Sequence, residues 1–309
     1  MDRELAWIAE ASGARQARRA DPIQSLWGGY GELFRVRLVG GNAPSVVVKW
    51  IKPPAESRSS TLSDARKRRS YEVETTWYRD FAARCDGTCR VPKLIASRVD
   101  ADQRLLVLED LDSAGFTERS RRASGNQVER CLAWLASFHA RFLGVAPVGL
   151  WTTGTYWHLS TRPEELAMID DSALRDAAPI LDERLRMARF QTLVHGDAKE
   201  ANFCFSQDSV AAVDFQYVGG GSGMKDVAYL LSGTCVDESS HLNLYFAHLR
   251  RALATSAGTV EADALEAEWR ALYPIAAADF YRFLAGWAKR HWEREGHGQR
   301  IVREVISRL

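Results

Sequence analysis

The sequence predicts an α+β fold with a β-rich N-terminal part and a mainly helical C-terminal part. Short apolar and β-branched runs fill the first third of the chain, for example residues 33–38, 46–48 and 105–108, and such runs are typical of strands. Much of the remainder repeats apolar residues at spacings of three and four, which is typical of helices. The segment 203–213 is an exception, because two apolar runs flank Ser206-Gln207-Asp208-Ser209 and predict a β-hairpin.

Length and composition indicate an ordinary globular protein. The 309 residues are enough for two domains with a sizeable core, and 46% are hydrophobic and 26% charged, as in most globular chains. A formal net charge of +1 gives no overall field that would favour nucleic acid or an anionic membrane. Residues 1–19 carry charges throughout, so we expect neither a signal peptide nor a membrane span there.

The five cysteines suggest a reducing compartment. Their number is odd, and unpaired thiols in a chain of this size are typical of cytoplasmic proteins. Cys85 and Cys89 lie close together, but no second Cys or His pair completes a zinc pattern. We therefore expect a cytoplasmic protein without a structural zinc site.

The first organised segment is a predicted hairpin of two strands. Residues 2–19 precede it and read as a polar helix or a loosely held arm. Lys49 ends the second strand, and Gly28-Gly29-Tyr30-Gly31 stands before the first. Such a glycine-rich loop lets backbone N–H groups approach phosphate oxygens, although an ordinary turn has the same composition.

A polar loop and a helix follow the hairpin. Residues 52–63 are polar and rich in serine, which predicts a loop. The basic run 66–69 is expected on a solvated helix face. The helical pattern continues to Ala83 and places Val73, Trp77 and Phe81 on one apolar face.

Further elements are read from apolar periodicity. Residues 91–96 and 105–108 predict two strands, and 128–142 predicts a helix whose buried stripe includes His139, interpreted as a hydrogen-bonded core histidine. Later segments are expected as follows: a helical segment at 163–190, a flexible glycine loop at 219–223, an N-cap at Asp226, and a helix carrying Phe280, Phe283, Leu284, Trp287 and His291.

The hairpin at 203–213 collects polar side chains at its open end. If Phe205 faces Val210, Asn202 and Asp214 become diagonal neighbours roughly 5–8 Å apart. Asp197 and Lys199 come just ahead of them in the chain. Any one of these residues is more often a turn or cap residue. Together, hard oxygen ligands beside an ammonium group suit a magnesium-bound phosphate.

The spacing of these residues resembles a known family. His195, Asp197 and Asn202 keep the spacing of the kinase catalytic loop, and Asp214-Phe215-Gln216 stands where D-F-G would. The chain is similar, over about 28–231, to the aminoglycoside phosphotransferase and choline-kinase-like (ecdysteroid-kinase-like) superfamily. That resemblance implies a two-lobed protein-kinase-like fold with ATP between the lobes.

The resemblance also implies roles in phosphoryl transfer. Asp197 would accept the proton of the acceptor hydroxyl or orient that hydroxyl, and Lys199 would meet the γ-phosphate, although a surface lysine is the alternative. Asn202 and Asp214 would hold Mg²⁺. His195 would hold the loop through hydrogen bonds.

The resemblance also assigns nucleotide-binding residues to the first third of the chain. Gly28, Gly29 and Gly31 would form the phosphate loop, and Lys49 resembles the V-A-I-K lysine that pairs with phosphates and a helix glutamate. The aromatic pair Trp77-Tyr78 favours Glu74 as that glutamate, and Glu72 stays possible.

The segment LVLEDL resembles the hinge between the lobes of these kinases. There, backbone groups from Glu109 to Leu111 would bind the adenine edge. The boundary is therefore expected near residue 111, with a nucleotide-binding lobe at 1–111 and a helical lobe at 112–309 that carries the catalytic loop and the acceptor site.

The sequence thus predicts an ATP- and magnesium-dependent phosphotransferase acting on a hydroxyl group of a small molecule. Nucleic acid and membrane partners are not expected. The alternative is a non-catalytic, kinase-like nucleotide-binding module. An aminoglycoside, an amino alcohol, a sugar and a sterol-like alcohol all stay open as the acceptor, as does the oligomeric state.

Overall fold

A computed structural model describes residues 1–54, 61–120, 122–234, 237–255 and 261–309. The chain forms two compact units. The sheet unit comprises residues 1–119 and 204–216, and the helical unit comprises residues 120–203 and 217–309. The predicted α+β class, with strands first and helices after, is confirmed. The first unit continues past residue 111 and also takes in the hairpin segment.

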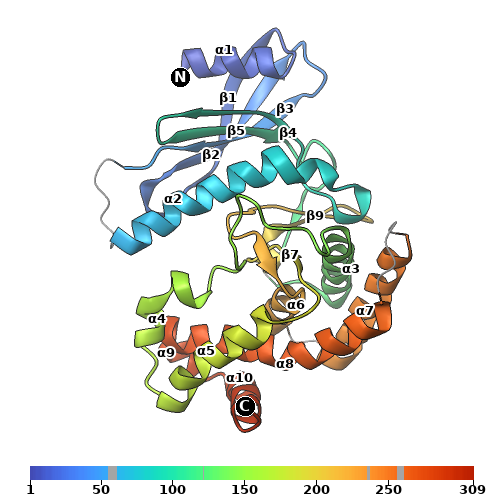
Figure 1. Ribbon diagram of the computed structural model, residues 1–309. Helices are drawn as coiled ribbons and strands as arrows, with labels where there is room; N and C mark the ends of the chain where they lie inside the picture. Colours follow the sequence, from blue (N-terminus) through green and yellow to red (C-terminus); the bar gives the residue numbers. More distant parts are fainter. Residues whose placement is uncertain (55–60, 121, 235–236, 256–260) are drawn as a thin grey trace. The chain divides into compact units, whose positions relative to one another are not determined.

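The sheet unit is built on a five-stranded antiparallel sheet with the order β1-β2-β3-β5-β4 (Figure 1). Its strands are β1 (Gln16–Ser25), β2 (Gly31–Val39), β3 (Ser45–Ile51), β4 (Leu94–Asp100) and β5 (Gln103–Glu109), and its helices are α1 (Asp2–Ala11) and α2 (Thr61–Thr76). The predicted β2–β3 hairpin is present. The predicted strand at 91–96 begins later than expected, at Leu94.

The N-terminal arm is better ordered than expected, because residues 16–25 add strand β1 to the sheet edge. The sequence QARRADPIQS lacks the apolar alternation that marks a strand, since the strand is largely exposed. Pairing with β2 supplies its stability instead, from Gln16 opposite Val39 to Ser25 opposite Glu32. Ile8 of α1 is buried and packs against the core formed by β2, β3 and β5.

A second, three-stranded sheet has the order β6-β8-β9. Its strands are β6 (Glu118–Arg119), β8 (Phe203–Phe205) and β9 (Val210–Ala212). The predicted four-residue connection is confirmed, since the Ser206 N–H donates to the Ser209 carbonyl at 2.9 Å. Beside it, the Ala212 N–H donates to the Arg90 carbonyl at 3.0 Å, which joins β9 to the segment before β4.

The helical unit packs α3 against α7, and packs α6, α5 and α10 against the long helix α8 (Figure 1). The bounds are α3 (Gly125–Arg141), α4 (Pro163–Ala167), α5 (Ser172–Arg186), α6 (Met224–Ser232), α7 (Glu238–Ala254), α8 (Ala262–Trp287), α9 (Lys289–Trp292) and α10 (Gly296–Ile306). Trp269 of α8 is fully buried. The helix predicted at 163–190 is interrupted, because Asp171 caps a new helix by accepting from the Ala173 N–H.

Two predictions in this unit were wrong. Residues 219–221 form strand β10 rather than a loop, pairing with β7 (Thr192–Val194). Glycine suits this strand, because a Cβ on Gly219 would lie 2.2 Å from the Trp151 carbonyl oxygen. Asp226 is the third residue of α6 rather than its N-cap, and its carboxylate binds the backbone of a neighbouring loop.

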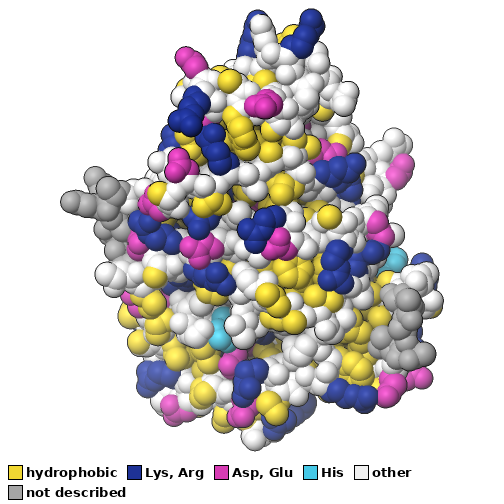
Figure 2. Space-filling view, turned by 45° about the horizontal axis from the view of Figure 1, so that its top comes forward, with side chains coloured by type: hydrophobic (Ala, Val, Ile, Leu, Met, Phe, Trp, Pro, Cys, Tyr) yellow, Lys and Arg dark blue, Asp and Glu magenta, His cyan; other side chains and the backbone are white. Residues whose placement is uncertain are grey.

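The surface mixes charges of both signs. On the face in Figure 2, Lys and Arg side chains are interspersed with Asp and Glu side chains, in keeping with the net charge of +1. Within the described residues, no helix combines the length and the apolar composition needed to cross a membrane.

The contact between α8 and α4 leads to a stability prediction. A Cβ on Gly286 would lie 1.8 Å from the Glu165 carbonyl oxygen, so Gly286→Ala forces the two helices apart. We expect a loss of about 3 kcal/mol in the free energy of unfolding, measured by urea denaturation. Gly296→Ala is the matched control, because open space surrounds Gly296 and the change should stay within about 1 kcal/mol. Equal stability of the two variants would contradict this packing.

Candidate active site

In the sheet unit, Lys49 and Glu74 form a buried ion pair. Lys49 lies on β3, opposite Leu33 on one side and Leu106 on the other. Its ammonium is 2.8 Å from Glu74 Oε1 and 2.7 Å from Oε2, and both residues are buried. Glu74 is therefore the partner of Lys49 in this structure.

Glu72, the other candidate, points elsewhere. It pairs with Arg104 at 3.1 Å and with Arg69 at 3.4 Å. The two glutamates differ by two positions on α2, which places them on different faces of the helix.

Asp214 joins the ion pair from the hairpin segment. Its Oδ1 lies 3.2 Å from the Lys49 ammonium and accepts from Gln216 Nε2 at 2.7 Å. Asp214 has φ of 68°, a left-handed conformation that few residues other than glycine adopt. Phe215 is buried and stacks on Trp77, with ring centroids 4.5 Å apart, so the residue after Asp214 fixes this turn against the segment that directly follows α2.

Burial and charge shift the pKa values of the pair. Burial lowers the pKa of Lys49, but the charges of Glu74 and Asp214 outweigh that effect and raise it above that of an ordinary lysine. Burial raises the pKa of Glu74 to about 7, although the Lys49 ammonium opposes the rise. Lys49 therefore stays charged, and Glu74 can take up a proton near neutrality.

The backbone conformation of the glycine-rich loop requires glycine at three positions. Gly28, Gly29 and Gly31 have φ of 70°, 77° and 129°, conformations in which a side chain is strained. A Cβ on Gly31 would also lie 2.0 Å from the Trp50 carbonyl oxygen, whereas open space surrounds Gly29. The loop thus presents bare backbone at Gly29, as phosphate binding requires.

The basic run 66–69 is not a simple solvated face, contrary to expectation. Arg66 is buried, and Lys67 is partly buried against the ring of Tyr30 in the glycine-rich loop. Arg68 and Arg69 do form ion pairs on the helix surface, with Asp64 and Glu72. A run of four like charges on a helix must cover every face, so one member faces the loop.

The candidate hinge residues are held mainly by structural contacts. The Glu109 carboxylate binds Arg90 at 2.5 Å and accepts from the Lys93 N–H at 3.0 Å. Leu111 is buried against Phe116, and its carbonyl accepts from the Phe116 N–H. The side chain of Glu109 is thus engaged within the sheet unit, and adenine binding by the backbone here stays a prediction.

In the helical unit, Asp226 anchors the loop that follows β7. Its carboxylate accepts from the His195 N–H at 2.6 Å and the Gly196 N–H at 2.9 Å, and it lies 3.1 Å from His139 Nε2. His139 Nδ1 contacts the Tyr245 hydroxyl at 2.8 Å, so this histidine is the hydrogen-bonded core residue that was expected. Gly196 has φ of 80°, and a Cβ there would lie 2.1 Å from the Tyr217 carbonyl oxygen.

Asp197 is held by two side chains that follow it in the same loop. Asn202 Nδ2 donates to the Asp197 carbonyl at 2.8 Å and to Oδ2 at 2.9 Å. Lys199 Nζ donates to the same Oδ2 at 2.9 Å. The structure therefore brings Asp197, Lys199 and Asn202 together within one short loop, with Asp197 buried and Lys199 half exposed.

Tyr229 is a contact of Asp197 that the sequence reading missed. Burial raises the pKa of its phenol, and the Asp197 carboxylate, to which its hydroxyl is hydrogen-bonded, raises that pKa further. The same hydroxyl is bonded to Tyr156. Tyr229 lies one helical turn after Asp226 on α6, and this spacing was the available signal.

A cavity of about 190 Å³ opens beside this loop. Lys199 and Tyr229 both line the cavity and both bind Asp197. The other lining residues are Glu200, Leu230, Ser232, Gly233, Phe280, Tyr281, Leu284, His291 and Glu295. Leucine and aromatic side chains form much of this wall, so the lining is largely apolar.

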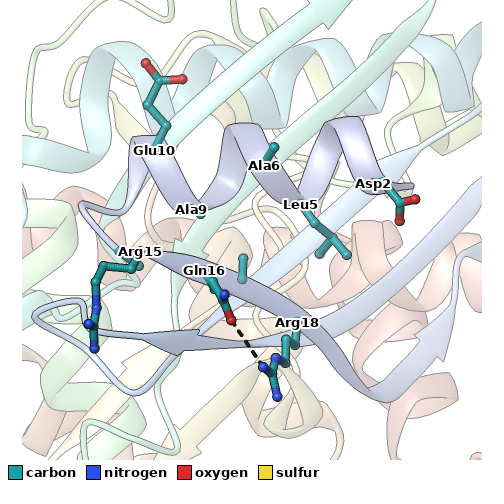
Figure 3. A pocket seen from close by; sticks show the side chains of 10 residues that line it. Asp2, Leu5, Ala6, Ala9, Glu10, Arg15, Gln16 and Arg18 are labelled. Carbon is teal, nitrogen blue, oxygen red and sulfur yellow. Dashed lines mark hydrogen bonds between the residues drawn. The ribbon is translucent and has the colours of Figure 1, made fainter.

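A second, larger cavity lies in the sheet unit. It has a volume of about 520 Å³ and lies between α1 and β1 (Figure 3). Arg18 donates to Gln16 at 3.1 Å along its floor. It contains none of the candidate site residues.

A family model for the phosphotransferase enzyme family matches residues 26–265. This span covers most of the chain and contains every candidate site residue. The chain belongs to this phosphotransferase family. No curated protein matched the sequence at the significance required.

Solved structures agree with a kinase-like fold for this phosphotransferase. A choline kinase from Cryptosporidium parvum has a TM-score of 0.55 at 11% identity, covering 94% of this chain and 90% of the other. A putative fructosamine-3-kinase from Haemophilus somnus has 0.54 at 12%, covering 99% and 96%. An amicoumacin kinase in complex with AMP-PNP, Ca²⁺ and Ami has 0.50 at 15%, covering 93% and 88%.

The Glu74 pKa of about 7 leads to a prediction for nucleotide affinity. Below about pH 7 Glu74 takes up a proton, and Lys49 loses one of its two carboxylate partners. We expect the affinity for MgATP to fall by about tenfold, or ~1.4 kcal/mol, between about pH 8 and pH 6, measured by calorimetry. Glu74→Gln removes the titrating group, so it should bind weakly throughout with a flatter profile. A profile in Glu74→Gln as steep as that of the parent would contradict this role.

Proposed function

We propose that this phosphotransferase moves the γ-phosphoryl group of ATP to a hydroxyl group of a small molecule, with Mg²⁺ as its metal ion. The carrying observation is the Asp197 carboxylate, buried and hydrogen-bonded to Asn202, Lys199 and Tyr229 beside a cavity. A carboxylate fixed in this way can orient a hydroxyl nucleophile and accept its proton. Positioning of this kind supplies much of the acceleration in phosphoryl transfer.

Lys199 is the cation of the transfer step. Its ammonium is bound to Asp197 Oδ2 while the side chain remains half exposed at the cavity. A γ-phosphoryl group arriving next to Asp197 would therefore meet a positive charge. Charge spreads over the phosphoryl oxygens in the transition state, so a cation at this point stabilises it.

The nucleotide phosphates are assigned to the sheet unit. Lys49 is held in one position by Glu74 and Asp214, and Gly28, Gly29 and Gly31 form a loop of bare backbone. The adenine is assigned to the backbone around Glu109 and Leu111, by the family resemblance. A held lysine costs little reorganisation when the phosphates bind.

Asn202 and Asp214 fit magnesium through their donor atoms. Asn202 uses its amide nitrogen to hold Asp197, so the amide oxygen is the atom it presents to a cation. Asp214 supplies a carboxylate, and both are hard oxygen donors of the kind Mg²⁺ prefers. Phosphate oxygens and water would complete the coordination of an ion held by these two donors. Bound Mg²⁺ would neutralise phosphate charge.

The cavity favours a compact acceptor with an apolar body. Its volume of about 190 Å³ lies below the ~300–1,000 Å³ of most drug-sized ligand sites. Its two carboxylates already bind backbone N–H groups, Glu200 that of Ala123 and Glu295 that of Gly298. A polycationic aminoglycoside would need several carboxylates, so a small alcohol with an apolar portion and at most one positive charge fits better.

Replacement of Asp197 tests the transfer step. Asp197→Asn keeps the shape of the side chain and removes the proton acceptor, so kcat should fall by about 10²–10⁴-fold. The affinity for MgATP should stay within about threefold, because Asp197 is assigned to the acceptor hydroxyl. Coupled ADP release and calorimetry measure the two quantities. A variant that retains about a tenth of the parent rate, a loss of only ~1.4 kcal/mol, would contradict the role of Asp197.

Asp214→Ala tests the metal site. It should weaken magnesium-dependent ATP binding by about tenfold or more, because it removes a metal ligand and a partner of Lys49. Unchanged magnesium-dependent ATP affinity in Asp214→Ala would remove Asp214 from the metal site. Nucleotide binding by the parent without turnover of any acceptor would favour the non-catalytic module.

A further inference from the structure

Lys67 lies on the same face of α2 as Glu74. Residues at spacings of three and four share one face of a helix, which groups Lys67 with Ser70, Tyr71 and Glu74. Glu74 binds Lys49, and the Lys49 ammonium lies 5.7 Å from the Tyr71 ring centroid. This face of α2 is therefore the one turned toward the buried ion pair.

Ser70 continues the same row toward Asp214. Its hydroxyl donates to Gln216 Oε1 at 3.3 Å, and Gln216 Nε2 donates to Asp214 at 2.7 Å. Lys67 stands one turn before Ser70, at the end of the row nearest the glycine-rich loop. Of the other residues on this face, Tyr71 and Glu74 contact Lys49 directly, and Ser70 contacts Asp214 through Gln216.

The Lys67 ammonium contacts the glycine-rich loop itself. It lies 5.0 Å from the Tyr30 ring centroid and 6.0 Å from that of Trp27. A Cβ on Gly28 would lie 2.5 Å from the Lys67 Nζ atom, so the ammonium lies directly against the backbone of the Gly28–Gly29 turn. The Tyr30 hydroxyl donates to Asp64 on α2, which ties the loop to the helix at this point.

Lys67 carries a charge that its surroundings leave poorly neutralised. Arg68 and Arg69 pair with Asp64 and Glu72, whereas across the described part of the chain Lys67 forms no salt bridge with a carboxylate. Burial lowers the pKa of Lys67, the Arg66 charge lowers it further, and Asp64 opposes both. An anion at this position would offset that unfavourable environment.

We propose that Lys67 is a second phosphate-binding cation of the nucleotide site, which contacts the terminal phosphates of ATP across the Gly28–Gly29 turn. Lys49 on β3 and Lys67 on α2 then each contact the phosphates, one from the sheet and one from the helix. Trp27, 86% exposed beside Lys67, forms the outer edge of this position. The proposal rests on the proposed function, since it assumes that the glycine-rich loop binds ATP. The competing explanation is that Lys67 only holds the loop closed through its contact with Tyr30.

Affinity as a function of phosphate number separates these explanations. Lys67→Met keeps the aliphatic stem and removes the charge. It should weaken MgATP binding by about tenfold or more, as expected for one lost charge-assisted contact, weaken MgADP binding less, and leave adenosine binding within about twofold. Lys67→Arg should restore most of the MgATP affinity. Arg69→Ala, on the same helix but paired with Glu72, is the control and should match the parent. Calorimetry with the three ligands provides the measurement.

Two results would overturn the proposal. Equal losses for MgATP and adenosine would show that Lys67 only holds the loop, and unchanged MgATP affinity in Lys67→Met would show that it does not touch the phosphates. Either result would leave the proposed function intact if the parent binds MgATP and Asp197→Asn abolishes transfer. A parent that fails to bind MgATP would instead refute the proposed function and this proposal together.

Discussion

The Lys49 ammonium between two carboxylates is the interaction on which the sheet unit depends. Glu74 comes from α2 and Asp214 from the hairpin segment, and both lie within 3.2 Å of Lys49. Removing one partner of a buried pair leaves an uncompensated charge at a cost of about 3–5 kcal/mol. The Lys49 ammonium thus links β3, α2 and the turn at Asp214 to one another.

In the helical unit, a single carboxylate, that of Asp226, holds the loop after β7 in place. Asp226 accepts from two successive backbone N–H groups, those of His195 and Gly196, and so fixes the direction in which the chain leaves β7. Asp197 follows directly and is held in turn by Asn202 and Lys199. Each functional side chain is therefore positioned by a residue that itself has little freedom, as precise positioning requires.

The sequence was most informative where spacing along one short segment sets the geometry. The contacts among Asp197, Lys199 and Asn202 could be anticipated because the loop is only a few residues long, and Lys49 because a β-branched run precedes it. Strand β1 could not be predicted, since its partner β2 stabilises an exposed, arginine-rich edge. The roles of Asp226 and Lys67 depend on which helix faces which loop, and no local pattern encodes that packing.

The most direct test of the central claim is ³¹P NMR of the parent protein with ATP, Mg²⁺ and a panel of small alcohols, amino alcohols and aminoglycosides. The account predicts a new phosphate-ester resonance with at least one compact alcohol, matched by an equal amount of ADP and dependent on Mg²⁺. ADP formed without any ester across the whole panel, or an ester formed equally well without Mg²⁺, would contradict it.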